Sequence, residues 1–278
     1  MNVRGYNYIA VYLTFACDNA CSYCITRIDG LIERNIVLAK DWINLFNAME
    51  ISGDVPITLQ GGEPTIYPEF YEIIAGIDLN KTFNLMTNLN FDPKEFIKKV
   101  PTNVFNRQAP FPSIRASYHV GQVGRDTIIN KMKILTDAGY NIGLYMLDHP
   151  LWQEEINRVK DICQNIGVEL RLKEYMDRSS DPAMFRYHYT QDRTVYCKNS
   201  DLIIGPDMNV YKCHYDLYSN HNPIFNIGTY DRDAIEPSWY LCTYPTRCNP
   251  CDLKIKNSRF QIWGYCAVEI INAENINN

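Results

Sequence analysis

The chain has 278 residues, of which 46% are hydrophobic and 21% are charged, and this balance excludes a disordered or collagen-like protein. Its formal net charge of −5 argues against nonspecific binding to nucleic acid, which requires clustered positive charge. The sequence holds neither a secretory signal nor a run of about 18 apolar residues. We therefore expect a cytoplasmic protein that has no membrane partner.

Strand-like and helix-like segments alternate over the first 175 residues. Such alternation predicts parallel strands joined by right-handed crossovers, with helices on the outside. Six units are too few for a closed eight-unit barrel, so the predicted fold class is α/β, a partial (β/α)6-type open TIM barrel with its functional groups at the carboxyl ends of the strands. Strands are expected at 8–15, 55–60, 82–87, 113–118, 141–147 and 168–172, and helices at 39–50, 67–77, 93–100, 126–138 and 152–163.

The alternation of strand-like and helix-like segments stops after the sixth expected strand. Residues 177–196 are polar and resemble a linker, and the segment from Leu202 to Cys213 contains a hairpin signal around Pro206 to Asn209. We expect two domains, the barrel at 1–180 and a small β-hairpin and cysteine-rich domain at 181–278.

Ten cysteines are the most informative feature of the composition. Three lie within the first 24 residues, none lies in the next 138, and six lie in the last 82. A core of this size needs no disulfides, so cysteines at short spacing indicate metal or redox chemistry. Their distribution predicts two sites, one near each end of the chain.

The N-terminal cysteines follow the first strand directly, in the pattern Cys17-x3-Cys21-x-Tyr23-Cys24. Three thiolates on one tight loop can converge on a single centre. A structural zinc ion normally takes four protein ligands, whereas an iron–sulfur cluster with three protein ligands keeps one position for a small chelating molecule. A zinc site or scattered core cysteines is the alternative interpretation.

This triplet, with an aromatic residue before its last cysteine, resembles the signature of the radical S-adenosylmethionine (radical SAM) superfamily. The resemblance implies that Cys17, Cys21 and Cys24 hold a [4Fe–4S] cluster and that the amine and carboxylate of S-adenosylmethionine chelate the fourth iron. It also implies reductive cleavage to a 5′-deoxyadenosyl radical, which abstracts a substrate hydrogen. An electron donor such as flavodoxin or ferredoxin is then expected.

A second motif follows the second strand. Gly61, Gly62, Glu63 and Pro64 resemble the family's Gly-Gly-Glu-Pro motif, which binds the methionyl ammonium of S-adenosylmethionine; alone, the same residues could form an ordinary turn. Glycines allow close backbone approach, and a carboxylate makes a charge-assisted bond to an ammonium. Further contacts to S-adenosylmethionine are expected by position at strand ends and just beyond, although each could equally be structural: Asn88, Ser117 and Arg125.

The C-terminal cysteines include a hairpin pair and a C-x2-C pair. Four thiolates can close a second [4Fe–4S] cluster or a zinc ribbon. The pattern resembles the auxiliary-cluster extension called SPASM or its shorter relative, twitch, with Met208 where that family usually has glycine and Asn209 expected to take the left-handed turn. Asn257 and Gln261 stand where a full SPASM has cysteines, so a one-cluster twitch is expected, similar to the twitch dehydrogenases. Its expected ligands are Cys197, Cys213, Cys248 and Cys251.

Three cysteines remain outside these two sets. Cys163 lies on the apolar face of its helix, and Cys266 lies in an apolar segment, so both are expected to pack in the core. Cys242 could be a core residue, an alternative cluster ligand or a thiol that donates hydrogen to a substrate radical.

The expected reaction is a two-electron oxidation, or a coupled bond formation, on a small polar biosynthetic metabolite, with the auxiliary cluster accepting an electron. Maturation of a ribosomal peptide by cross-linking or epimerisation is the alternative, and we expect no leader-peptide-binding module ahead of the first strand. A non-enzymatic zinc or iron–sulfur binding module is the alternative from another class, and nucleic acid is disfavoured as a partner. Side chains that could face a substrate are Arg115, Tyr118, His119, Lys173 and Tyr175.

Overall fold

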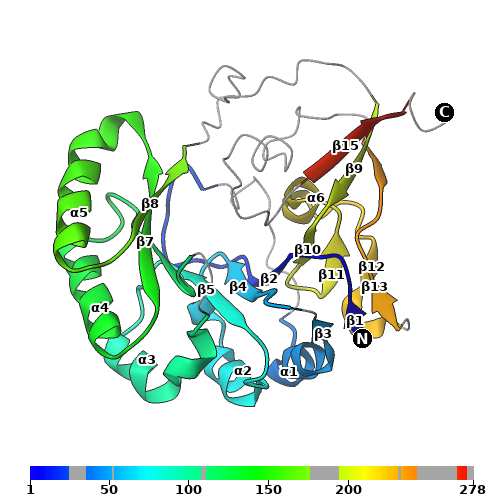
Figure 1. Cartoon of the computed structure of the whole chain (residues 1–278), viewed down its shortest axis with the longest axis horizontal. Coiled ribbons are helices and arrows are strands. Elements are labelled where there is room, and N and C mark those ends of the chain that lie inside the picture. The colour runs from blue at the N-terminus through cyan, green and yellow to red at the C-terminus, as the bar shows by residue number, and fades with distance from the viewer. Residues whose placement is uncertain are drawn as a thin grey trace.

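A nine-stranded sheet organises the computed structural model (Figure 1), which describes residues 1–24, 36–51, 53–107, 111–175, 194–230, 233–242 and 268–273. The strand order is β12-β11-β10-β2-β4-β5-β6-β7-β8, and the pairs from β10 to β8 are parallel. The six strands of the predicted barrel are β2 (Tyr8–Thr14), β4 (Ile57–Gly61), β5 (Phe83–Thr87), β6 (Ile114–Ser117), β7 (Ile142–Asp148) and β8 (Leu170–Glu174).

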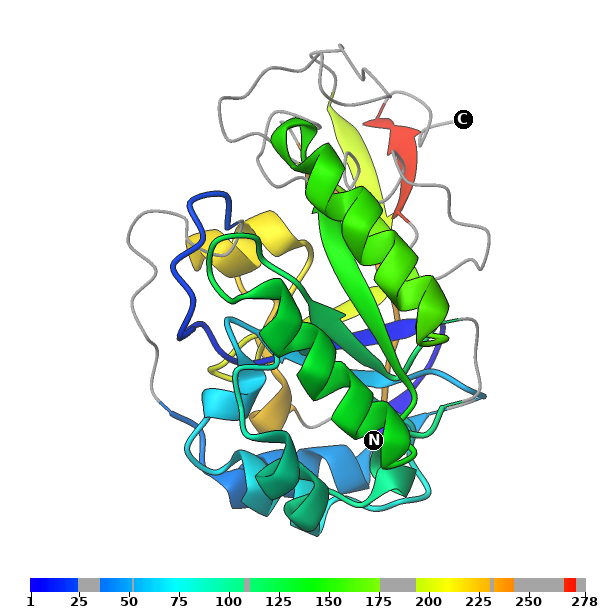
Figure 2. The same cartoon turned by 90° about the vertical axis from the view of Figure 1, so that its left-hand side faces the viewer.

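Five helices connect these strands and cover the outside of the sheet (Figures 1 and 2). All five expected helices are present, and α2 begins three residues later than expected because residues 64–66 form a separate turn of 3-10 helix ahead of it. This alternation confirms the partial, open barrel. The helices are α1 (Ala39–Ala48), α2 (Phe70–Gly76), α3 (Pro93–Lys99), α4 (Arg125–Asp137) and α5 (Gln153–Asn165).

The two faces of the barrel sheet differ in chemistry, because side chains alternate along each strand. Aliphatic and aromatic residues such as Ile57 and Leu59 of β4 point outward and join a continuous core with Trp42 and Phe46 of α1. The intervening residues point inward, and many of them are polar. The inner positions of the central strands are Tyr8, Ala10, Tyr12, Thr58, Gln60, Asn84, Met86, Arg115, Ser117, Tyr145, Arg171 and Lys173.

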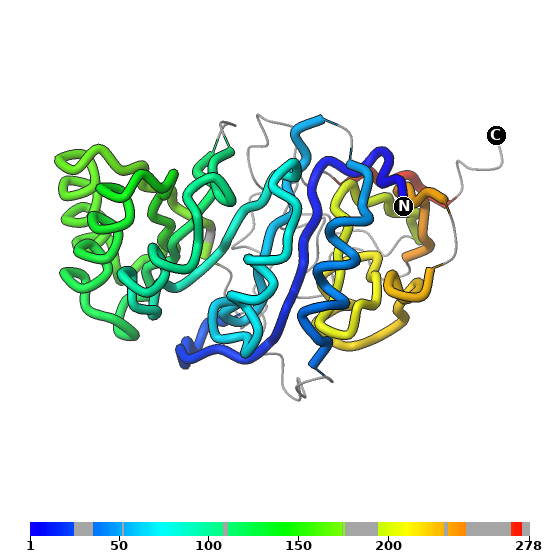
Figure 3. The backbone as a smooth tube through the Cα atoms, turned by 90° about the horizontal axis from the view of Figure 1, so that it is seen from below, coloured from blue at the N-terminus to red at the C-terminus, as the bar shows by residue number. Residues whose placement is uncertain are grey.

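The C-terminal part of the chain continues this sheet. Strand β10 (Asp201–Ile204) pairs in parallel with β2 and antiparallel with β11 (Asn209–Tyr211); β12 (Phe225–Asn226) and the short helix α6 (His214–Ser219) follow. Figure 3, a view from below, shows the blue N-terminal strand between the cyan and yellow parts of the chain. The predicted hairpin is therefore confirmed, and it is an extension of the barrel sheet.

Two small three-stranded sheets complete the described structure. The first, of order β13-β1-β3, joins β13 (Ala234–Ile235), β1 (Asn2–Val3) and β3 (Glu50–Ile51). The second, of order β14-β9-β15, joins β14 (Tyr240–Cys242), β9 (Val195–Asn199) and β15 (Val268–Asn272). Most of the expected linker at 177–196 lies outside the described residues, and its last two residues belong to β9, so the expectation of a linker is wrong there.

The hairpin turn corrects one residue of the sequence interpretation. Met208, and not Asn209, takes the left-handed conformation, with φ +60°, because the turn closes one residue earlier than expected: the Met208 N–H donates to the Gly205 carbonyl at 2.9 Å. The Asn209 side chain is instead held by Asp207, at 2.9 Å. Burial of the Met208 side chain offsets a left-handed backbone that costs about 1–2 kcal/mol.

None of the helices in the described part of the chain has both the length and the apolar character that a bilayer-crossing helix requires.

Candidate functional site

The cysteine triplet lies on the loop that leaves β2 at its carboxyl end. Cys21 is buried, while Cys17 and Cys24 are half-buried, and a turn joins the Cys24 N–H to the Cys21 carbonyl at 3.2 Å. The Cys17 sulfur accepts a hydrogen bond from the Asn19 N–H at 3.4 Å. Burial raises the pKa of the Cys17 thiol and the Asn19 N–H lowers it, with a net rise. A positive centre beside Cys17, such as a bound iron ion, would favour its thiolate form.

The two glycines of the second motif are held against the backbone that leads into this loop. The Gly62 N–H donates to the Thr14 carbonyl at 2.9 Å. A Cβ on Gly61 would lie 2.2 Å from the Thr14 carbonyl oxygen, and one on Gly62 would lie 2.0 Å from the Ala16 carbonyl oxygen. Glycine is required at both positions because backbone meets backbone there. The motif thereby fixes the start of the cysteine loop.

Glu63 is buried directly behind that loop and is surrounded by donors. Its Oε1 accepts hydrogen bonds from the Thr65 N–H at 3.1 Å, the Thr65 hydroxyl at 2.6 Å and the Thr87 hydroxyl at 2.8 Å, and its Oε2 accepts one from the Asn88 N–H at 2.6 Å. Burial raises the pKa of the Glu63 carboxyl, and these four bonds lower it without cancelling the rise. A cation placed beside Glu63 would stabilise the carboxylate further.

Asn88, at the carboxyl end of β5, links the two motifs. Besides the bond from its N–H to Glu63, its Nδ2 donates to Asp18 Oδ1 at 2.6 Å and lies 3.9 Å from the Cys17 sulfur. The structure therefore brings together three residues that the sequence placed in the site, Cys17, Glu63 and Asn88. Asp18 was not expected in this network; its position one residue after Cys17 was the available signal.

The other two expected contacts are placed differently. Ser117 ends β6 on the inner face and pairs in register with Tyr145 of β7. Arg125 is the first residue of α4, where its guanidinium pairs with Glu155 at 3.1 Å and with Asp126 at 3.2 Å. Tyr118, expected to face a substrate, donates to Glu155 at 2.9 Å and packs in the outer core, so that expectation is wrong. The strand ends one residue earlier than expected, and Tyr118 follows the outward alternation.

Aromatic rings gather beside the cysteine loop. The Tyr23 hydroxyl is 3.0 Å from His119 Nδ1, and its ring centroid is 5.3 Å from that of Trp152. His149 stacks on Trp152 at 4.4 Å and meets Tyr175 edge-on at 4.3 Å. Only Tyr23, His119 and Tyr175 were singled out from the sequence. Trp152 and His149 lie in the segment between β7 and α5, and no pattern in the sequence of that segment indicates that they join Tyr23 in one aromatic cluster.

The half-buried His119 should make the free energy of unfolding depend on pH. Burial lowers the pKa of its imidazole from 6.5 to about 4, so protonation favours the unfolded chain. The contribution is intact above pH 6.5 and is lost as the pH falls toward 4, by about 2 kcal/mol between pH 7 and pH 5. Urea unfolding at the two pH values should show this loss, and His119→Gln should flatten it. An equal loss in the variant would assign the pH dependence to other groups.

Glu63→Gln should lower the free energy of unfolding by about 2 kcal/mol, because the new amide group presents its own N–H atoms to donors that need an acceptor. Glu95→Gln is the matched control, since Glu95 is exposed and pairs only at the surface, with Lys99 at 2.6 Å; its change should stay below about 1 kcal/mol. Thermal or urea unfolding measures both. Equal effects would show that the four donors do not depend on the Glu63 carboxylate.

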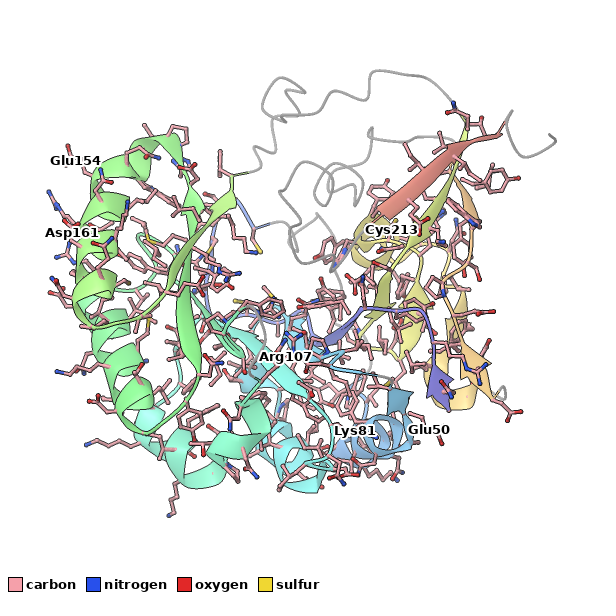
Figure 4. The ribbon with its side chains drawn as sticks, in the orientation of Figure 1. Glu50, Lys81, Arg107, Glu154, Asp161 and Cys213 are labelled. Carbon is pink, nitrogen blue, oxygen red and sulfur yellow. The ribbon has the colours of Figure 1, made fainter. Side chains whose placement is uncertain are left out.

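The second group of expected ligands is partly described. Cys197 lies in β9, and Cys213 immediately precedes α6. Figure 4 shows Cys213 on the side of the molecule opposite Glu154 and Asp161 of α5. Cys248 and Cys251 lie outside the described residues, as does Cys266. Cys163 is buried in α5, which confirms its place in the core, and burial raises its pKa to about 11.

Within the described ranges, no three His, Cys, Asp or Glu side chains meet at a point where one metal ion could be held. A cubane cluster makes a different demand, because each thiolate binds a separate iron atom. Three thiols on one loop, with N–H groups directed at the Cys17 sulfur, fit that demand. Hydrogen bonds to the sulfur atoms are among the factors that set the potential of such a cluster.

Comparison with known proteins agrees with this site. The model of the protein family described as "Radical SAM superfamily" matches residues 11–161, which are more than half of the chain. GTP 3′,8-cyclase of Clostridium botulinum is 22% identical over an alignment of 214 residues, and the match covers 72% of this chain and 66% of the cyclase. The chain thus spans just under two thirds of that relative's length.

Two solved structures share the fold. Streptococcus suis SuiB bound to precursor peptide SuiA superposes with a TM-score of 0.58 at 15% identity, over 81% of this chain and 63% of SuiB. A histidine-tagged form of anSMEcpe with bound AdoMet gives 0.57 at 11% identity, over 80% of this chain and 78% of that one. With the match at residues 11–161, which includes both the cysteine triplet and Gly61 to Pro64, the chain belongs to the radical SAM superfamily.

Proposed function

We propose that this radical SAM enzyme binds its [4Fe–4S] cluster through Cys17, Cys21 and Cys24 and uses the 5′-deoxyadenosyl radical to oxidise a small polar metabolite by two electrons, or to form a bond coupled to that oxidation. Radical cleavage of S-adenosylmethionine at a [4Fe–4S] cluster follows from the superfamily. Membership also disfavours the non-enzymatic binding module, because such a module has no use for a three-cysteine loop joined to Gly61 to Pro64.

Around the cluster, this chain's own residues would orient S-adenosylmethionine. The buried Glu63 carboxylate and the close backbone of Gly61, Gly62 and Pro64 suit an ammonium group. Asn88 is held by Glu63 and Asp18 at the same strand end, and Ser117 ends the inner face of β6. Arg125 would reach the carboxylate of S-adenosylmethionine only by sharing its guanidinium with Glu155.

The proposal of a polar substrate rests on the side chains that line the inner face of the barrel sheet. Arg115 of β6 is buried there, donates to the Tyr8 hydroxyl at 2.5 Å and to the Thr58 hydroxyl at 3.3 Å, and stacks over Phe111 at 5.0 Å. The Lys173 ammonium of β8 lies 5.0 Å from the centre of the Tyr145 ring. A wall of cations and hydroxyls beside Ser117 favours a hydrophilic, anionic molecule over an apolar one.

Asn84 of β5 adds a second polar feature to the same wall. Its side chain is fully buried on the inner face, in register with Thr58, and within the described part of the chain neither its Oδ1 nor its Nδ2 has a hydrogen-bond partner. Leaving such a group unsatisfied costs about 1–3 kcal/mol. The amide is therefore well placed to meet a polar group of a small molecule or of ordered water.

The proposed C-terminal cluster, bound by Cys197, Cys213, Cys248 and Cys251, would complete the oxidation. The substrate would lose a hydrogen atom to the 5′-deoxyadenosyl radical and one proton to a neighbouring base or to solvent, and a cluster held by these cysteines would supply the acceptor for the remaining electron. Two electrons and two protons leave the substrate in total. An electron donor such as flavodoxin or ferredoxin supplies the single electron that starts each turnover.

The test is the redox state of the product. Anaerobic enzyme with S-adenosylmethionine and a one-electron reductant would be offered pools of small carboxylates and phosphates, and mass spectrometry would follow 5′-deoxyadenosine and the product. We expect a product that is lighter by two hydrogens, and Lys173→Met should raise the substrate KM. A product of unchanged mass with inverted stereochemistry would contradict the oxidation.

Maturation of a ribosomal peptide remains the second candidate. It is favoured by the fold shared with SuiB, whose structure contains a precursor peptide, although a likeness at 15% identity carries the fold alone. A cross-linked or epimerised peptide, formed in preference to any small molecule, would support this candidate over the first.

A further inference from the structure

Cys242 lies on the same face of the β14-β9-β15 sheet as the expected cluster ligand Cys197. Strands β14 and β9 are antiparallel, with Tyr240 opposite Cys197 and Cys242 opposite Val195. Residues directly opposite one another share a face, and so do residues two apart on one strand. Cys197 and Cys242 are therefore diagonal neighbours across the pair, a spacing of about 7–8 Å or somewhat less between Cβ atoms.

The other face of this sheet is turned toward solvent. Leu241 of β14 and Ile271 of β15 both lie opposite Tyr196 of β9, and their side chains are 49% and 36% exposed. Cys197 and Cys242, on the opposite face, are half-buried. The two thiols thus point to the protein side of the sheet.

The third thiol, Cys213, approaches the same face. Asn199 shares the face of Cys197 by alternation, and its Nδ2 donates to the carbonyl of Lys212 at 3.4 Å. Cys213 is the residue after Lys212 and immediately precedes α6, and the Lys212 ammonium pairs with Asp216 of that helix at 3.3 Å. This contact between Asn199 and Lys212 therefore brings the start of α6, and Cys213 with it, to the face that carries Cys197.

We propose that Cys242 supplies a thiolate to the C-terminal iron–sulfur cluster, together with Cys197 and Cys213. The proposal rests on the auxiliary cluster of the proposed function. A cubane cluster has four iron atoms, and each takes one cysteine ligand. With Cys242 as a ligand, the cluster needs only one of Cys248 and Cys251, although the sequence analysis expected both.

The surroundings of Cys242 differ from those of a core cysteine. Cys163 is enclosed by apolar side chains, which disfavour its thiolate. Cys242 instead is half-buried and lies diagonally across the strand pair from a second cysteine, Cys197.

The test uses the full chain with Cys17, Cys21 and Cys24 changed to Ala, so that only the C-terminal cluster is counted. After anaerobic reconstitution this parent should hold about four irons per chain. Adding Cys242→Ala should reduce the iron and sulfide content as strongly as adding Cys197→Ala, whereas Cys163→Ala should leave both unchanged. Circular dichroism would verify that each variant is folded.

A ligand role has a spectroscopic signature that a packing role lacks. Cys242→Ser should retain part of the cluster through its hydroxyl oxygen and shift the electron paramagnetic resonance signal of the reduced form. Full iron content and an unshifted signal in both Cys242 variants would overturn the proposal and leave the auxiliary cluster standing. A parent without iron and sulfide would instead refute the auxiliary cluster itself, and with it the proposed ligand.

Discussion

Replacing Cys17, Cys21 and Cys24 together by alanine should lower the iron content from about eight to about four per chain and should abolish formation of 5′-deoxyadenosine. The physical reason is that these three thiols lie on the loop after β2, where Asn88 links the buried Glu63 to Cys17. Iron and sulfide analysis measures the first effect, and chromatography of the reaction mixture measures the second.

Cys163→Ala is the control for this experiment, because Cys163 is buried in α5, in the outer core of the barrel. It should keep the full iron content and full cleavage activity, at a cost in stability of about 1 kcal/mol. If the triple variant still cleaves S-adenosylmethionine, the cluster is bound elsewhere. About four irons in the unsubstituted enzyme, with zinc retained in the triple variant, would make the C-terminal site a zinc ribbon and would favour redox-neutral chemistry.

Gly62→Ala should disable the enzyme without touching a cysteine. The new Cβ would lie 2.0 Å from the Ala16 carbonyl oxygen and 2.5 Å from that of Phe15, so the backbone that leads into Cys17 must move. We expect a loss of about 3 kcal/mol in the free energy of unfolding and a weaker hold on the cluster. Urea unfolding and iron retention during gel filtration would measure the two effects.

Gly124→Ala is the matched glycine control. Gly124 precedes α4, has an ordinary backbone conformation, and its added Cβ would meet only the Thr127 hydroxyl at 3.6 Å. Its effect on stability should stay below about 1 kcal/mol. If Gly62→Ala behaved like this control, the contact between the two backbones would not determine the position of the cysteine loop.

The barrel could be predicted from the sequence because its strands and helices are set by local patterns. The apolar run at 8–15 and the amphipathic pattern at 126–138 correspond to β2 and α4 within one or two residues. The same is true of the motifs at Cys17 to Cys24 and at Gly61 to Pro64, since each combines an unusual spacing with a place at a strand end.

What the sequence did not reveal depends on contacts between distant segments. The pairing of β10 with β2, the contact of Trp152 with Tyr23 and the bond from Asn88 to Asp18 join residues whose local patterns carry no sign of a partner. The left-handed Met208 was missed for another reason: local propensity favours Asn209 there, whereas burial of the Met208 side chain selects the register of the turn.

The position of β2 between β4 and β10 has a consequence for how the chain is made. One edge of β2 finds β4 early in synthesis, but the other must wait for β10, and the bond between the hydroxyls of Tyr12 and Tyr218, at 2.9 Å, spans 206 positions. Until β10 is made, the second edge of β2 has unpaired backbone groups, which can pair with strands of other chains. Contacts between segments so far apart in the sequence also form slowly. β10 and α6, which are synthesised long after β2, therefore complete the support of the strand that leads into Cys17, Cys21 and Cys24.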